Sequence, residues 1–155
     1  HKSDAELAVL YQPILKAHGI DVPDEVAGRV AGIMKERATF IGDLWDLTSF
    51  FFVAPTEYDE KQTRKYWKGD NPAILARLRE VLATIDDFSL ENTERIVHAW
   101  IEENGYPMGQ VMNTLRLALV GAGKGPGMYD VTSFLGKEET LRRIDSLIAN
   151  LKPAE

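Results

Sequence analysis

Apolar side chains recur at every third or fourth position along almost the whole chain, and this spacing limits the fold more than any other feature. The pattern is clearest after Asn71-Pro72, where apolar residues follow at a near-ideal helical period as far as Ile85. Asparagine is a favoured helix cap and proline suits the first helical turn, so a helix is predicted to begin there. Other helices are predicted over about 4–18, 23–37, 40–52, 89–104, 107–120, 127–135 and 137–151.

Strands are not predicted, because no hairpin dipeptide separates two alternating runs. The one rival is LRLALV, residues 115–120, which also alternates at period two. Within the first helix, Pro13 is expected to cause a kink or to end its first part. The stretch VAPTEYD, residues 53–59, interrupts the helical pattern. We therefore predict an all-α fold of two small helical subdomains, 1–56 and 57–155.

Composition excludes several classes of protein. The 155 residues include no cysteine, which rules out disulfides, thiolate zinc sites and a cysteine nucleophile, and which suits a reducing cytoplasm. His1, His18 and His98 are far apart in the sequence, so no metal site is predicted. No apolar run approaches the roughly 18 residues of a membrane span. The formal net charge of -6 argues against nucleic-acid binding, although a local basic patch can outweigh the total.

The glycine-rich stretch VGAGKGPG, residues 120–127, looks at first like a phosphate-binding loop. The Walker A motif, however, needs glycine where Ala118 stands and serine or threonine where Gly125 stands. Pro126 also lacks the amide proton that a phosphate would need. We therefore predict a turn between two helices, with Gly121 near the end of one and Pro126 at the first position of the next.

No catalytic centre is predicted from the remaining side chains. Asp43 and Asp46 could form a pair of acids, but they are expected to lie on the exposed face of the third helix. His98 has the apolar neighbours Val97 and Trp100 nearby, so it is expected to pack half-buried rather than to act as a base.

A basic segment follows the break between the subdomains. Its cations Lys61, Arg64, Lys65 and Lys68 alternate with Tyr66 and Trp67, and Arg77 and Arg79 follow on the next predicted helix. One interpretation is a solvated amphipathic segment whose aromatic residues enter the core. The other is a surface that follows the backbone of RNA or DNA.

Two arginines are isolated from this segment. Arg37 ends a predicted helix, and Arg116 is flanked by Leu115 and Leu117. An arginine in such an apolar context has either a buried carboxylate partner or an exposed planar role such as stacking. The spacing does not choose between the two.

Residues 111–144, VMNTLRLALVGAGKGPGMYDVTSFLGKEETLRRI, resemble the C-terminal anticodon-binding region of bacterial glutamyl-tRNA synthetase. The family pattern is P-L-R-x-A-L-T-G, a short loop with G-P or T-P, a short helix, then L-G-K-E and a basic last helix. The stretches 30–52 and 11–20 are similar to the family's second and opening helices, so the resemblance covers essentially the whole chain.

This resemblance implies the helical-cage architecture of that region and a set of anticodon contacts. Arg37 matches the arginine that reads the third anticodon base. Arg116 matches the arginine that packs against the first two bases, and Gly125, Pro126 and Met128 hold the places that complete their pocket.

The sequence departs from the family pattern in two places. Thr114 stands where the family has proline, and Gly125 stands where some members have threonine. A hydroxyl contact from the second place is therefore not expected, which bears on discrimination at the first anticodon base.

The resemblance also implies a non-catalytic role for this chain. Signatures like H-I-G-H and K-M-S-K-S, which bind ATP in class I synthetases, do not occur in it. ATP and Mg²⁺ are thus expected in a missing catalytic domain of glutamate-tRNA ligase, with no cofactor here. The expected partner is the anticodon loop of tRNA-Glu, bound by a cytoplasmic monomer that contacts neither DNA nor membrane. Phosphate contacts are expected from Lys61, Arg64, Lys65, Lys68 and Lys124.

Two further hypotheses come from other functional classes. A helical protein-interaction domain with no RNA role would agree with the acidic net charge. A small phosphotransferase built on the glycine loop would require affinity for ATP.

Overall fold

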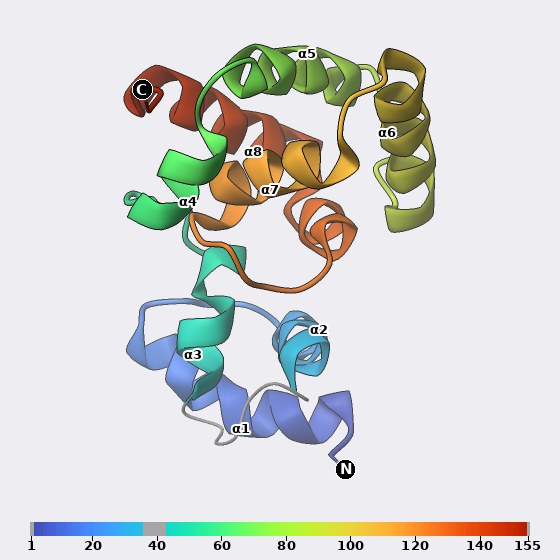
Figure 1. The fold of residues 1–155 in the computed structure, drawn as a ribbon. Coiled ribbons are helices and arrows are strands. Elements are labelled where there is room, and N and C mark those ends of the chain that lie inside the picture. The colour runs from blue at the N-terminus through green and yellow to red at the C-terminus, as the bar shows by residue number, and fades with distance from the viewer. Residues whose placement is uncertain (1, 36–42, 155) are drawn as a thin grey trace. The chain divides into compact units, whose positions relative to one another are not determined.

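The computed structural model describes residues 2–35 and 43–154, and regular structure within these ranges is helical, without strands (Figure 1). The predicted all-α fold is confirmed, and LRLALV is part of a helix. In chain order the elements are α1 (Asp4–Ala17), α2 (Asp24–Met34), α3 (Asp43–Thr48), the 3-10 turn η1 (Ser49–Phe51), α4 (Glu60–Tyr66), α5 (Asn71–Ala83), α6 (Leu90–Asn104), α7 (Met108–Val120) and α8 (Met128–Asn150).

The chain divides into two compact units, His1–Val53 and Ala54–Glu155. The division lies close to the predicted one between residues 56 and 57. That each unit is an anticodon-binding subdomain stays a prediction.

In the first unit, α1 and α2 pack against each other along their length. They run antiparallel, since the amide of Gln12 donates to the Val22 carbonyl at 2.7 Å near one end and Lys35 pairs with Asp4 at 3.8 Å near the other. Gly28 permits this approach, because a Cβ there would lie 2.6 Å from the Asp4 carbonyl oxygen. The helices therefore meet closely at a position where a side chain could not fit.

Serine side chains cap two of the helices. The Ser3 hydroxyl accepts from the Glu6 amide in a capping box, and the Ser89 hydroxyl caps α6 through the Asn92 amide. Of the two outcomes predicted for Pro13, the helix does not end there, because α1 continues past it to Ala17. The predicted start of α5 was wrong in detail. Asp70 rather than Asn71 is the cap of α5, so Asn71 is already the first helical residue.

Helix α7 is the centre of the second unit, because α4, α5, α6 and α8 all contact it (Figure 1). Its apolar residues Val111, Leu115, Leu117, Ala118 and Leu119 are buried. Burying a leucine side chain contributes roughly 1.5–3 kcal/mol, so this row of residues is a major part of the unit's core.

Trp67 anchors the end of α4 in the same unit. The side chain is buried, and its indole N–H donates to the Leu151 carbonyl at 2.8 Å. One aromatic residue of the basic segment therefore enters the core, as the first interpretation of that segment proposed.

Two glycines set the path between α7 and the end of the chain. Gly121 ends α7 in the left-handed conformation (φ 79°), which confirms its predicted place near the C-cap. Pro126 does not open the next helix, because α8 begins at Met128 with Gly127 as its cap. Gly136 (φ 81°, ψ 169°) interrupts α8, close to the predicted break before Lys137.

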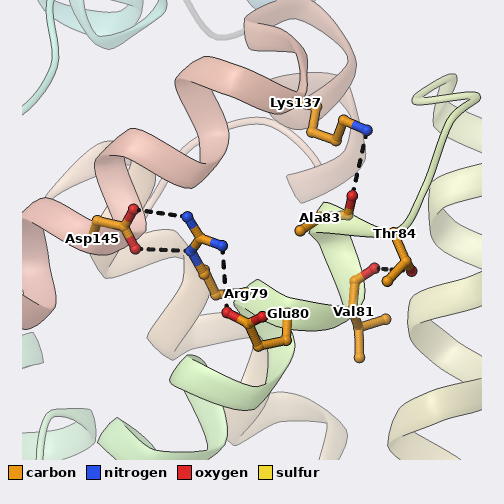
Figure 2. A network of polar contacts seen from close by, with 7 residues as sticks. All are labelled: Arg79, Glu80, Val81, Ala83, Thr84, Lys137 and Asp145. Carbon is orange, nitrogen blue, oxygen red and sulfur yellow. Dashed lines mark hydrogen bonds and ion pairs between the residues drawn. The ribbon is translucent and has the colours of Figure 1, made fainter.

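Polar contacts fasten α8 to α5 (Figure 2). The Arg79 guanidinium donates Nε and Nη2 to the two carboxylate oxygens of Asp145, at 3.0 and 3.1 Å. The Lys137 ammonium donates to the carbonyl of Ala83, the last residue of α5, at 3.4 Å and to that of Ile85 just after it at 2.9 Å. Arg79 and Lys137 are therefore held by contacts within the fold.

Among the helices of the described ranges, none is both long enough and apolar enough to cross a membrane.

Candidate nucleic-acid interface

Arg116 projects from the last turn but one of α7 toward the loop that follows the helix. Its Nη1 donates to the Pro126 carbonyl oxygen at 2.8 Å, and its side chain is half-buried. The bond joins two residues that the sequence analysis assigned to one pocket. Because the loop carbonyl holds one edge of the guanidinium, the orientation of the planar group is restricted.

Arg116 lines a shallow depression of about 300 Å³. This volume is at the lower end of the range for small-molecule sites. Met128 shares the depression with Arg116, whereas Gly125 and Pro126 are not among its lining residues, and Pro126 is buried. The lining consists of Leu90, Glu94, Met112, Arg116, Gly127, Met128, Tyr129 and Asp130.

Sequence reasoning missed Glu94 and Tyr129 in this depression. Tyr129 is buried, and among the described residues its hydroxyl has no hydrogen-bond partner. Burial raises the pKa of the Tyr129 hydroxyl, and the negative charge of Glu94 raises it further, so the hydroxyl remains protonated. His98 packs edge-on against the Tyr129 ring at 5.3 Å and is half-buried, which confirms the packing role predicted for it.

The loop after α7 is fixed at its start and exposed in its middle. The Asp59 amide donates to the Gly121 carbonyl at 2.8 Å. A Cβ on Gly121 would lie 2.8 Å from Pro55 Cβ and 2.9 Å from the Glu57 carbonyl oxygen. Lys124 is exposed, as a phosphate contact would require.

The predicted base-reading residue Arg37 lies outside the described residues. Asp46 is exposed on α3 and Asp43 is half-buried. Among the described residues, no group of three or more histidine or acidic side chains is placed to hold a metal ion.

The basic segment forms α4 and the turn after it. Its cations follow helical spacing, so Lys61, Arg64 and Lys65 share one face of the helix. Arg64 forms an ion pair with Glu60 at 3.3 Å, which partly neutralises it. Since Trp67 is in the core and the cations face solvent, the segment is amphipathic, as the first interpretation holds.

Lys65 and Lys68 border a groove of about 950 Å³ in the second unit. The sequence analysis singled out these two lysines and Arg77, but it missed Tyr106, Gln110 and Asn113. No local signal links those three to the basic segment, because they come from the start of α7 and the turn before it. The lining comprises Lys65, Tyr66, Lys68, Gly69, Asp70, Asn71, Ala73, Ile74, Arg77, Tyr106, Pro107, Gly109, Gln110 and Asn113.

The chain is similar in sequence to glutamate–tRNA ligases. That of Phocaeicola vulgatus is 55% identical over 151 residues, which cover 97% of this chain and 30% of the relative. The chain thus spans about 30% of the length of this relative.

The fold is also similar to that of solved glutamate tRNA ligase structures. A glutamate tRNA ligase from Elizabethkingia meningosepticum matches 97% of this chain and 30% of its own, with a TM-score of 0.91 and 38% identity. The glutamate-tRNA synthetase from Elizabethkingia anophelis matches with a TM-score of 0.85 and 36% identity, over 96% of this chain and 29% of its own. The family model described as "Anticodon binding domain" matches residues 6–148, which is most of the chain. The chain therefore belongs to the anticodon-binding domain family.

Proposed function

We propose that this chain reads the anticodon loop of tRNA-Glu as the non-catalytic part of a glutamate–tRNA ligase. The full enzyme attaches glutamate to tRNA-Glu in the cytoplasm, with ATP and Mg²⁺ bound outside this chain. The chain itself needs no cofactor, acts as a monomer and does not bind DNA. Membership of the anticodon-binding family disfavours the alternative of a protein-interaction domain with no RNA role.

The observation that carries the proposal is the arrangement of Arg116 in its depression. The Pro126 carbonyl holds the guanidinium, which lines the depression together with Met128. An unstacked loop base can stack on a guanidinium plane and on an apolar side chain, while its polar edge remains free for hydrogen bonds. We assign the first two anticodon bases to this depression and the third to Arg37, whose donor fork suits the acceptors of a base edge.

The test measures the binding of anticodon stem-loops that differ in one anticodon base. We expect Arg37→Ala to relax discrimination at the third base by about 1–3 kcal/mol, if its contact is bidentate. Arg116→Ala should weaken discrimination at the first two bases and leave the third unaffected. A fluorescence titration at two salt concentrations checks both, because phosphate contacts weaken with salt and base contacts do so less.

The control is Lys152→Ala, which removes an exposed cation in the second unit that lines neither the depression nor the groove. It should keep the wild-type preference at all three bases. If the wild-type chain bound every anticodon with equal affinity, the assignment of the anticodon bases to Arg116 and Arg37 would be refuted. Aminoacylation of tRNA-Glu and tRNA-Gln by the full-length enzyme then shows whether the readout excludes tRNA-Gln.

A further inference from the structure

The groove bordered by Lys65 and Lys68 has a charge opposite to that of the chain as a whole. The chain carries a formal net charge of -6, yet the groove is lined by three cations, Lys65, Lys68 and Arg77, and by one carboxylate, Asp70. A concave surface with an excess of one charge concentrates its field, so this groove attracts anions despite the acidic total.

The three cations keep their charge available to a ligand. Among the described residues, no carboxylate forms an ion pair with Lys65, Lys68 or Arg77. Other arginines of the same unit differ, since Arg64 and Arg79 pair with carboxylates at 3.3 and 3.0 Å. Within the part of the chain that the structure describes, the basic side chains of the groove thus have no acidic partner in an ion pair, unlike Arg64 and Arg79.

Neutral aromatic groups position two of these cations. The Lys65 ammonium lies 5.3 Å from the centre of the Tyr66 ring, and Arg77 Nη1 donates to the Tyr106 hydroxyl at 2.9 Å. Tyr106 is itself braced edge-on by Trp100 at 5.3 Å. A neutral partner orders a cation without cancelling its charge, so the positive field remains directed at the groove.

The remaining lining suits a nucleic-acid backbone better than a small anion. The rings of Tyr66 and Tyr106 are half-buried, and Gln110 and Asn113 add amide groups. Cations that follow a backbone, combined with aromatic rings on which bases or riboses pack, are the usual means of binding single-stranded nucleic acid. The volume of about 950 Å³ also exceeds that of the Arg116 depression about threefold.

Helix α7 connects the groove to the Arg116 depression. Asn113 lines the groove, and Arg116 lies three residues further along the same helix, so the two are about 4.5 Å apart along its axis. One RNA strand can therefore contact both places. We propose that the groove binds the sugar-phosphate backbone of the nucleotides next to the bases held at Arg116, and this inference rests on the proposed function.

The test compares Lys65→Ala/Lys68→Ala with the wild-type chain in titrations of the anticodon stem-loop at several salt concentrations. We expect a loss of affinity of about tenfold at low salt. The slope of log K against log salt should become shallower by about 1.4, for two phosphate contacts on a single strand. The preference among anticodon bases should not change, because phosphate contacts carry no sequence information.

Two further variants complete the experiment. Lys65→Arg/Lys68→Arg keeps the charge and should restore most of the affinity, whereas Lys152→Ala removes a cation outside the groove and should leave the slope unchanged. Circular dichroism checks that each variant is folded, which the exposure of both lysines favours.

The outcomes separate this inference from the proposed function. If the double alanine variant binds like the wild type while Arg116→Ala loses base preference, the groove proposal is overturned and the proposed function stands. If the wild-type chain binds no anticodon stem-loop even at low salt, both are overturned. A shallower slope with unchanged base preference supports the groove.

Discussion

At the residue scale, the two neighbouring arginines of the last helix have different surroundings. Arg143 is 2% exposed and donates to the Glu139 carboxylate at 2.7 Å and to the Leu119 carbonyl, near the end of α7, at 2.9 Å. Arg142 is exposed and donates to both oxygens of the same carboxylate, from Nε to Oε1 and from Nη2 to Oε2. Glu139 therefore neutralises the one buried arginine of the described core.

Partial burial acts to raise the pKa of Glu139, but the hydrogen bonds and charges of Arg142 and Arg143 outweigh it, so the net shift is downward. A carboxyl with a lowered folded-state pKa stabilises the fold above its ordinary pKa of 4.5. That contribution is lost as the pH falls through the lower, folded-state value. Acid should therefore release Arg143 from its partner.

We predict that Glu139→Gln destabilises the chain by about 1–2 kcal/mol at pH 7, because the buried Arg143 would lose its charge-assisted hydrogen bond to the Glu139 carboxylate. The figure is below that of a fully buried pair since solvent reaches Glu139 and screens the interaction. Urea unfolding at pH 7 measures it. The same unfolding repeated from pH 5 to pH 3 should show a smaller loss of stability in the variant, and equal losses would contradict the role of this carboxylate.

The residues of the Arg116 depression could be predicted from sequence to different degrees. Arg116 was predicted as a site residue from the distinctive motif around it, and the structure adds its hydrogen bond to the Pro126 carbonyl. Its role in reading bases stays a prediction. Tyr129 could not be predicted, because a tyrosine beside an apolar stretch gives no sign that its hydroxyl will be buried without a partner.

At the element scale, Gly121 and Gly105 end helices in the same left-handed conformation but in different surroundings. A Cβ on Gly105 would meet nothing within 4 Å, whereas one on Gly121 would collide with Pro55 and the Glu57 carbonyl. The two glycines thus separate the cost of the backbone conformation from the cost of a steric clash.

We predict that Gly105→Ala costs about 1 kcal/mol, from the left-handed conformation alone. Gly121→Ala should cost about 2–4 kcal/mol, because overpacking adds to that strain. It should also weaken anticodon stem-loop binding by displacing the loop that holds Arg116. Thermal unfolding measures the stability of both variants, and titration measures their affinity for the stem-loop. Equal destabilisation by the two substitutions would show that the loop moves to relieve the clash at residue 121 at little cost.

Helix ends were largely predictable, and the groove was not. Ser3, Ser89 and Gly121 mark ends through local hydrogen bonds or backbone conformation, which a short stretch of sequence encodes. The groove depends on Tyr106 and Gln110 lying beside the basic segment about forty residues earlier. Such a contact follows from packing around α7 and has no local signal.

At the scale of the whole molecule, the second unit has its own core around α7. We predict that residues 54–155 fold without the first unit and unfold in one cooperative transition. They should keep the base preference that depends on Arg116 and lose the preference at the third base that we assign to Arg37. Calorimetry and stem-loop titration of this shorter chain measure both. If the shorter chain kept its preference at all three anticodon bases, the assignment of the third base to Arg37 in the first unit would be wrong.

The division into two units was predicted within a few residues, because a break in helical spacing accompanies it. The larger assignment, that both units contact one anticodon, depends on family resemblance rather than on spacing. Periodicity shows which residues face a core, but a surface that binds RNA is recognised only when side chains from several helices are seen together.

The position of α7 inside its unit fixes the spacing between the groove and the Arg116 depression, which we propose contact one RNA strand. One helix carries Asn113 on the groove and Arg116 in the depression, and four other helices enclose it. An inserted or deleted residue between them would turn one site by about 100° relative to the other. Because both lie on α7, this helix fixes the distance and the angle between the groove and the depression, and a loop movement cannot change either.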